Sequence, residues 1–314
     1  MNKRKILAAF RFSVAAIVLF FLYRAVQDAR QKLTAEDGFS LSDIRLHWLA
    51  IAGMFYFVGL MPMAIYWHRM LHSLGQSPTF TQTLSAFYLG HLGKYVPGKA
   101  MVVVIRTGCL RKANVNPTVA AVSVFAETLT MMAVGAFLAA AILTVNFFEQ
   151  RWLLVLALGL MTLAGVPTWP PVFRWLVQRL RVTKFEPEVE TALHGYTVRL
   201  TLFGWIANGI GWFILGLSLW AVLQAIPLNP PPASLPAIWL RLTAAVCLAV
   251  VAGFLSLLPG GIGVREIVLD ELMVEPFGRL AALVSAVLLR LVWLMTEVLI
   301  SSILYIGMRL RTKR

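Results

Sequence analysis

The apolar stretch 237–275 is interrupted by LPGGIGVRE at residues 258–266, and the apolar stretch 80–108 is interrupted by GKYVPGK at residues 93–99. Proline removes a backbone donor and disrupts a helix interior, while glycine tolerates conformations that other residues avoid. Each Pro-Gly pair is therefore expected to end one helical arm and begin another. We predict that both stretches enter the membrane, turn at the Pro-Gly pair and leave on the same side, as re-entrant helical hairpins.

Composition places these breaks in a membrane protein. Of 314 residues, 59% are hydrophobic and only 13% are charged, whereas soluble domains carry about 25% charged residues. A soluble chain of this composition would expose large apolar patches, and a disordered chain would contain far fewer apolar residues. The sequence therefore predicts an all-α, polytopic integral membrane protein.

Uninterrupted apolar stretches identify the spanning helices. A helix needs about 20 apolar residues to cross the hydrocarbon core. Six stretches qualify: 6–24, 48–67, 118–145, 152–172, 199–224 and 279–308. The first of these is taken as a retained span, because no convincing signal-peptidase site follows it.

The basic residues indicate orientation. Lys and Arg number 28 against 14 Asp and Glu, and they cluster beside apolar runs, which is the positive-inside pattern and not a nucleic-acid-binding face. The N-terminus, the loop 173–198 and the tail 309–314 are basic and are predicted to be cytoplasmic. The loops 146–151 and 226–236 are predicted to lie outside, which places the chain in the cytoplasmic (inner) membrane with both termini inside.

These assignments are consistent only if neither interrupted stretch crosses the membrane. The order then becomes span, span, hairpin, span, and it repeats once, with the first copy starting inside and the second outside. We therefore predict one membrane domain, residues 1–314, built as an inverted repeat with halves 1–148 and 149–314. Interrupted segments at matching positions of two halves are the best sequence indication of a transporter's binding site.

The first break has the features of an anion site. A helix starting at Pro97 would direct the free N–H groups of Gly98 and Lys99 at the preceding cavity, and its dipole would add positive potential. Lys94 and Lys99 add full charges, and Arg106 follows on the same arm. The alternative is an ordinary proline-initiated helix at the interface, whose lysines meet lipid phosphates.

The second break offers a comparable site. Its backbone permits close approach of a ligand through Pro259, Gly260, Gly261 and Gly263. Arg265 can hold a phosphate with two hydrogen bonds. Glu266 can pair with Arg265, with a basic residue across the cavity or with a headgroup amine. The alternative is a loop with a salt bridge that joins the two halves.

Three further charged residues lie deep in predicted spans, namely Glu127, Arg290 and Glu297. Charges at membrane depth cost about 2.5–3.5 kcal/mol each on insertion scales, so they require partners. Ion pairing between helices is the simplest interpretation. The candidates at membrane depth include more basic than acidic residues, which favours an anionic ligand: Lys94, Lys99, Arg106, Arg265 and Arg290 against Glu127, Glu266 and Glu297.

Enzymatic and metal motifs are missing from the sequence. It has no HExxH motif, no P-loop and only two cysteines, Cys109 and Cys247, so we predict no cofactor, no metal and no enzymatic activity. One acidic pair, Glu36-Asp37, leaves open an alternative, an integral-membrane transferase acting on a polyprenyl-phosphate or glycolipid.

The two interrupted segments resemble the hallmark segments of the lysylphosphatidylglycerol synthase transmembrane-region family, the flippase-like domain of the multiple peptide resistance factor. The resemblance extends over essentially the whole chain through its span layout. It implies roles for Pro97, Gly98, Arg106, Pro259, Gly260, Gly263 and Glu266. Members often carry a Glu-Arg pair and a following Asp on the helix after the first hairpin, but here Glu127 is followed by Thr128, which puts that charge pairing in doubt.

The resemblance implies a lipid flippase or transporter that moves an anionic, aminoacylated or glycosylated phosphate-bearing lipid between leaflets. Since no ATP site is present, transport is expected to be passive or ion-coupled, with Glu127 or Glu297 able to carry a proton. The family's soluble aminoacyl-transferase domain is absent from these 314 residues, so lipid aminoacylation is not expected. Expected partners are the lipid substrate and enzymes of envelope or glycolipid biosynthesis; an accessory subunit of an envelope-lipid complex is the other alternative.

Overall fold

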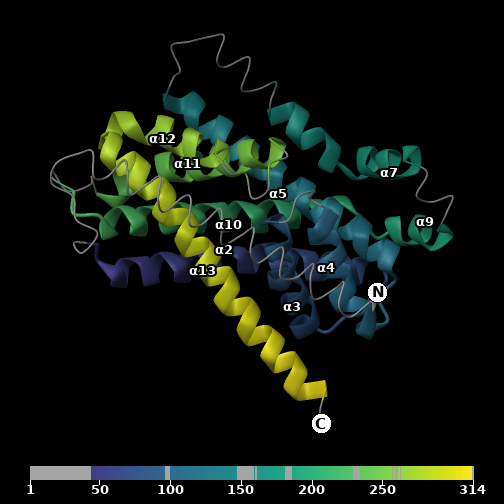
Figure 1. Ribbon diagram of the computed structural model, residues 1–314. Helices are drawn as coiled ribbons and strands as arrows, with labels where there is room; N and C mark the ends of the chain where they lie inside the picture. The colour runs from purple at the N-terminus through teal and green to yellow at the C-terminus, as the bar shows by residue number, and fades with distance from the viewer. Residues whose placement is uncertain are drawn as a thin grey trace.

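A computed structural model describes residues 44–95, 100–146, 159, 161–180, 186–228, 234–256, 258, 261 and 263–312. These residues form helices and no strands (Figure 1), so the all-α prediction is confirmed. Several predicted features lie outside the described residues. They are the span 6–24, residues 152–158 and 160 of the span 152–172, Glu36-Asp37, the first break at Pro97, Gly98 and Lys99, and the second break at Pro259 and Gly260.

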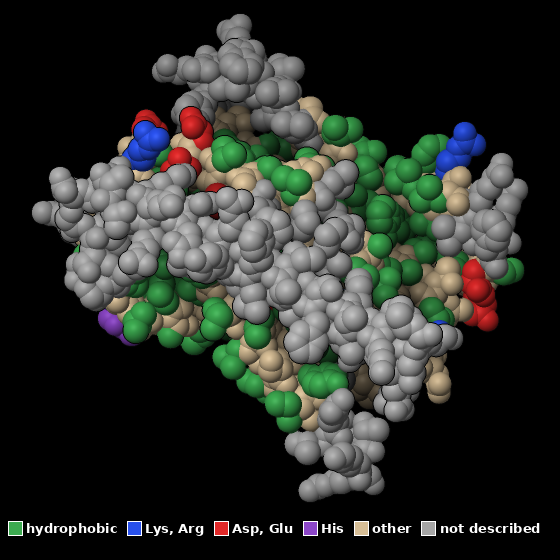
Figure 2. All heavy atoms as spheres, viewed as in Figure 1, with side chains coloured by type: hydrophobic (Ala, Val, Ile, Leu, Met, Phe, Trp, Pro, Cys, Tyr) green, Lys and Arg blue, Asp and Glu red, His purple; other side chains and the backbone are tan. Residues whose placement is uncertain are grey.

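Five described helices are long and apolar enough to cross a membrane. They are α2 (Leu46–Ser73), α5 (Pro117–Asn146), α10 (Val198–Ala225), α11 (Leu235–Leu255) and α13 (Arg279–Thr312). Large apolar side chains remain exposed on them, for example Ile206 at 64% and Met295 at 66%. In Figure 2, hydrophobic side chains cover the middle of the visible described surface, and charged side chains lie toward its ends. The chain is thus a multi-pass membrane protein.

The first interrupted stretch has two short arms. They are α3 (Phe80–His91) and α4 (Ala100–Leu110), with the 3₁₀ turn η2 (Leu92–Tyr95) after α3. Their 12 and 11 residues correspond to about 18 Å and 16 Å of helix. A hydrocarbon core is about 30 Å thick, so each arm reaches only about halfway through it.

The second interrupted stretch differs from the first. Its second arm, α12 (Val264–Phe277), has 14 residues, but its first arm, α11, has 21 residues, about 31 Å at 1.5 Å per residue. By length and composition α11 qualifies as a span in its own right. The two stretches are therefore not matched pairs of half-length arms, and the re-entrant path of 237–275 stays a prediction.

Helices α2 and α10 run antiparallel along their whole length. Their paired contacts are Arg45 with Ala225, Ala52 with Ser218, Gly59 with Gly211, and Tyr66 with Gly204. Each step advances seven residues in one helix and retreats seven in the other, which is a regular two-turn packing repeat. Gly59 and Gly211 are both the 14th residue of a 28-residue helix. A Cβ on Gly211 would lie 2.7 Å from the Gly59 carbonyl oxygen, so the backbones touch at the helix midpoints.

The contacts around this central pair occur in equivalent sets. Helix α5 packs against α10, and α13 packs against α2. Likewise α4 packs against α5 and α12 against α13, while α3 meets α13 and α11 meets α5. Figure 1 shows α13 crossing α2 and α10 obliquely. This equivalence is the pattern that an inverted repeat produces; the repeat itself stays a prediction.

The turns η3 (Arg111–Ala113) and η4 (Val166–Thr168) are two further described elements. Two short helices follow: α7 (Pro170–Arg179) begins inside the predicted span 152–172 and continues into the loop predicted to be cytoplasmic, and α9 (Pro187–Leu193) lies within that loop. Their apolar side chains pack around Tyr196 in a separate core cluster. The Tyr196 hydroxyl donates to the Thr168 carbonyl oxygen at 3.1 Å, and the backbone carbonyl oxygen of Tyr196 accepts from Arg174 at 2.8 Å. Burial raises the pKa of Tyr196, so its hydroxyl remains a protonated donor.

Candidate functional site

A cavity of about 430 Å³ lies where the two interrupted stretches meet. Its walls come from α2, the α3–α4 stretch, α5, α10, the α11–α12 stretch and α13. Most lining side chains are apolar, and the polar lining residues are Tyr56, His91, Lys94, Arg106, Glu127, Thr128 and Arg265. An apolar cavity with a few convergent polar groups is the usual form of a ligand site.

Arg106 and Glu127 form a buried ion pair between α4 and α5. Arg106 Nη1 donates to Glu127 Oε2 at 2.6 Å, and the side chains are only 3% and 1% exposed. The Arg106 guanidinium also lies over two rings, 4.3 Å from the centroid of Phe87 and 4.9 Å from that of Trp67. A Cβ at Gly90 would come within 2.4 Å of Arg106 Cγ, so glycine is required for the arginine to pass α3. This cation is therefore paired with a carboxylate and packed against two aromatic rings.

Glu266 and Arg290 form the corresponding pair between α12 and α13. One carboxylate oxygen of Glu266 accepts from Arg290 Nη1, and the other accepts from the backbone N–H of Gly263 at 2.8 Å. Gly263 has φ +83°, a conformation that favours glycine, and it begins the helix. Of the three partners that the sequence allowed for Glu266, the structure selects a basic residue on another helix. In the first pair the arginine lies on α4 and the glutamate on α5. In this second pair the glutamate lies on α12, which corresponds to α4, and the arginine on α13, which corresponds to α5.

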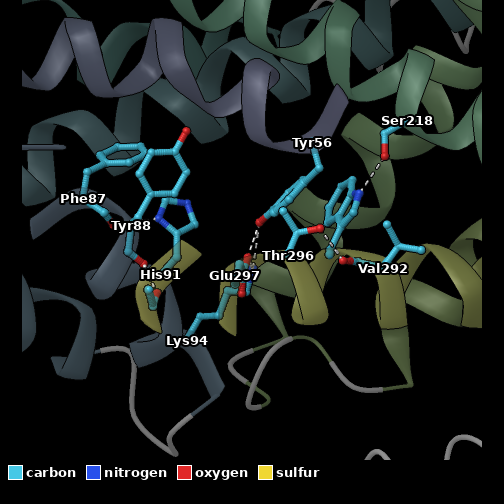
Figure 3. A network of polar contacts seen from close by, with 11 residues as sticks. Tyr56, Phe87, Tyr88, His91, Lys94, Ser218, Val292, Thr296 and Glu297 are labelled. Carbon is cyan, nitrogen blue, oxygen red and sulfur yellow. Dashed lines mark hydrogen bonds and ion pairs between the residues drawn. The ribbon is translucent and has the colours of Figure 1, made fainter. Parts of the chain in front are cut away.

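Tyr56, Lys94 and Glu297 form a third network, which joins α2 and η2 to α13 (Figure 3). Oε1 of the buried Glu297 accepts from both the Tyr56 hydroxyl and the Lys94 ammonium, and Lys94 also lies 3.3 Å from the Tyr56 hydroxyl oxygen. The Tyr56 ring stacks on Trp293 at 4.5 Å between centroids. Unlike the other two pairs, this network connects residues from the two predicted halves of the chain.

Arg265 lies in the cavity wall without an acidic partner. No Asp or Glu of the described residues lies within 4.0 Å of its guanidinium, and its Nε has no hydrogen-bond partner among them. A Cβ at Gly253 would lie 2.6 Å from Arg265 Cγ, which repeats the packing of Arg106 against Gly90. Gly261, at φ +69°, also approaches Gly253 closely. Arg265 therefore presents a positive charge to the cavity.

The structure brings together part of the predicted site. Lys94, Arg106, Gly261 and Arg265 line the cavity, and Glu127 lines it beside Arg106. Glu266 and Arg290 line a small recess next to it, which Arg265 also borders. Gly263 is exposed at the start of α12 and borders neither. The roles predicted for Pro97, Gly98, Lys99, Pro259 and Gly260 stay predictions.

Sequence reasoning missed several residues of the site. Tyr56, His91 and Trp293 line the cavity, but each lies in an apolar stretch where an aromatic residue carries no functional signal. Gly90 and Gly253, which each accommodate an arginine, were recognisable as glycines just before a break. Among the described residues no three His, Cys, Asp or Glu side chains gather as a metal site would require.

Comparison with known proteins agrees with this architecture. No curated protein matches the chain. The family model described as Lysylphosphatidylglycerol synthase TM region matches residues 6–301, which include both interrupted stretches and the cavity. The chain therefore belongs to the lysylphosphatidylglycerol synthase TM region family.

Proposed function

We propose that the protein moves a phosphate-bearing anionic lipid between the leaflets of the cytoplasmic membrane, with the headgroup held in the central cavity. The observation that carries this proposal is Arg265, a cation that faces the cavity without an acidic partner among the described residues. Arginine binds phosphate through two parallel hydrogen bonds. A lipid phosphate would supply the missing countercharge.

The rest of the cavity supports a lipid over a soluble anion. Phe125 and Leu258 line the cavity and are 51% and 46% exposed. Their exposed apolar surface is suited to contact with acyl chains. The cavity's apolar wall and its charged end together fit a molecule with a polar headgroup and apolar tails.

The helix arrangement supports movement of the headgroup between two sides. The equivalent contacts of α2 and α10, α5 and α13, and α4 and α12 are those expected of two related halves packed face to face. Rocking of such halves around a central site gives alternating access. The sequence contains no P-loop, so the proposed transport is passive or coupled to an ion.

The test is lipid translocation in proteoliposomes with fluorescent phosphatidylglycerol as probe and dithionite quenching as readout. Arg265→Ala is expected to slow translocation about tenfold to one hundredfold, because charge-assisted hydrogen bonds contribute about 1.5–3 kcal/mol. Arg199→Ala, which removes an exposed arginine at the start of α10, is the matched control. Equal rates for wild type and Arg265→Ala, with both proteins folded, would refute the proposal.

A further inference from the structure

Glu297 differs from the other two ion-paired carboxylates, Glu127 and Glu266, in what holds it. Glu127 is paired with Arg106 from the adjacent arm of its own predicted half, and Glu266 with Arg290 from the next helix. Glu297 depends on Tyr56 and Lys94, both from the other predicted half. Its Oε2, like Oε1 of Glu127, is buried with no hydrogen-bond partner in the described part of the chain. Its only ion-pair partner within that part is therefore the Lys94 ammonium.

Lys94 is also the cavity cation best able to change partners. Arg106 is held by Glu127 and two aromatic rings. Lys94 is 21% exposed at its side chain while Glu297 is fully buried, and Lys94 lines the same cavity as Arg265. A lysine ammonium on its four-carbon stem can rotate toward a phosphate more readily than a stacked guanidinium can.

A headgroup phosphate at Arg265 thus competes with Glu297 for Lys94. If Lys94 turns to the phosphate, the Glu297 carboxylate stays buried beside the neutral Tyr56 and Tyr95, with no cation of the described residues within 4.0 Å. A buried carboxylate without a cation is strongly disfavoured and becomes neutral by taking up a proton. When the headgroup leaves, Lys94 returns to Glu297 and the proton is released.

We propose that binding of an anionic headgroup at Arg265 and Lys94 is linked to uptake of one proton by Glu297, so that translocation is coupled to protons. This inference rests on the proposed function and specifies the ion that couples transport. It also distinguishes Glu297 from Glu127, whose partner Arg106 is packed against two aromatic rings as well.

Other titratable groups near Glu297 define the control. Tyr56 faces it from α2, Lys94 and Tyr95 from η2, Arg265 and Glu266 from α12, and Arg290 from its own helix. His91 on α3 lines the same cavity, and α10 contributes to the network only through Ser218, which accepts from Trp293. Protonation of His91 would also favour an anion, so the experiment must separate it from Glu297.

The experiment is calorimetric titration of the purified full chain in detergent with dihexanoyl-phosphatidylglycerol, a soluble monoanionic phosphodiester. Repeating it in two buffers of different ionisation enthalpy counts the protons taken up on binding. We expect about one proton per bound lipid for the wild type, and a Kd that falls up to tenfold for each unit decrease in pH. Glu297→Gln is expected to take up no proton and to bind independently of pH. Glu190→Gln, an exposed residue of α9, should behave as wild type, and His91→Gln should retain proton uptake.

The outcomes are separable. Wild-type binding without proton uptake overturns the coupling and leaves the proposed function intact. Proton uptake that persists in Glu297→Gln, or that disappears in His91→Gln, assigns the proton to a group other than Glu297 and also overturns the proposed coupling. Absence of any binding refutes the proposed function and the coupling together. The wild-type proton count requires no variant, so absence of uptake overturns the coupling even if Glu297→Gln does not fold.

Discussion

Removing one partner of the Arg106–Glu127 pair should destabilise the protein far more than removing both. In Glu127→Leu the Arg106 guanidinium, 3% exposed, would lose its countercharge. Breaking a buried pair in this way costs about 3–5 kcal/mol. The Phe87 and Trp67 rings at 4.3 Å and 4.9 Å contact the guanidinium in the wild type and in the variant alike, so their cation–π attraction does not offset this cost. We therefore expect a loss of about 3–5 kcal/mol.

The double variant Arg106→Met/Glu127→Leu replaces the pair by apolar side chains of similar volume. Such replacements are often neutral or stabilising, so we expect it to lie within about 1 kcal/mol of the wild type. The free energy of unfolding is measured by titrating the protein with SDS in mixed micelles and following circular dichroism, with the exposed Glu190→Leu as control. If the double variant loses as much as the two single variants added together, the charges do not depend on each other and the reasoning is wrong.

Two further predictions concern the helix core and the topology. Gly211→Val should lower the free energy of unfolding by about 1–3 kcal/mol through overpacking, because its Cβ would lie 2.7 Å from the Gly59 carbonyl oxygen. Gly209→Val, where a Cβ would meet nothing within 4 Å, is the matched control, and equal SDS unfolding curves would argue against the close crossing. Single cysteines at Gly98 and Gly261 should react with impermeant maleimide from opposite sides, cytoplasmic for Gly98 and external for Gly261. Labelling of either residue only from the other side would contradict the inverted hairpins.

Much of the fold was predictable because a membrane span is a local property. A helix in hydrocarbon satisfies its own backbone and must be apolar for about 20 residues. The predicted spans 48–67, 118–145, 199–224 and 279–308 accordingly lie within described helices. The second break was harder, because the Pro-Gly pair shows where an arm ends but not whether that arm is long enough to cross. In the structure α11 is long and apolar enough to cross a membrane, which the position of the Pro-Gly pair did not indicate.

The sequence predicted that the buried charges would be paired, but not which residues would pair with each other. Buried charges had to find partners, and Glu127, Glu266, Arg290 and Glu297 all have one. Which partner each would take did not follow from spacing: Glu266 pairs with Arg290 rather than with its neighbour Arg265. Arg290 and Glu297 are seven residues apart on α13, which places them on one helix face. The spacing does not say which helix covers that face.

The sequence by itself determined that the chain is a multi-pass α-helical membrane protein with basic residues near two breaks, because hydropathy, helix length and proline chemistry act over short stretches. Only the tertiary structure decided that Lys94 neutralises Glu297 across 203 residues of chain while Arg265 faces the cavity without a described acidic partner. Those partnerships depend on where α2, α10 and α13 cross. The helix crossings in turn depend on close contacts such as Gly59 with Gly211, which only the folded arrangement specifies.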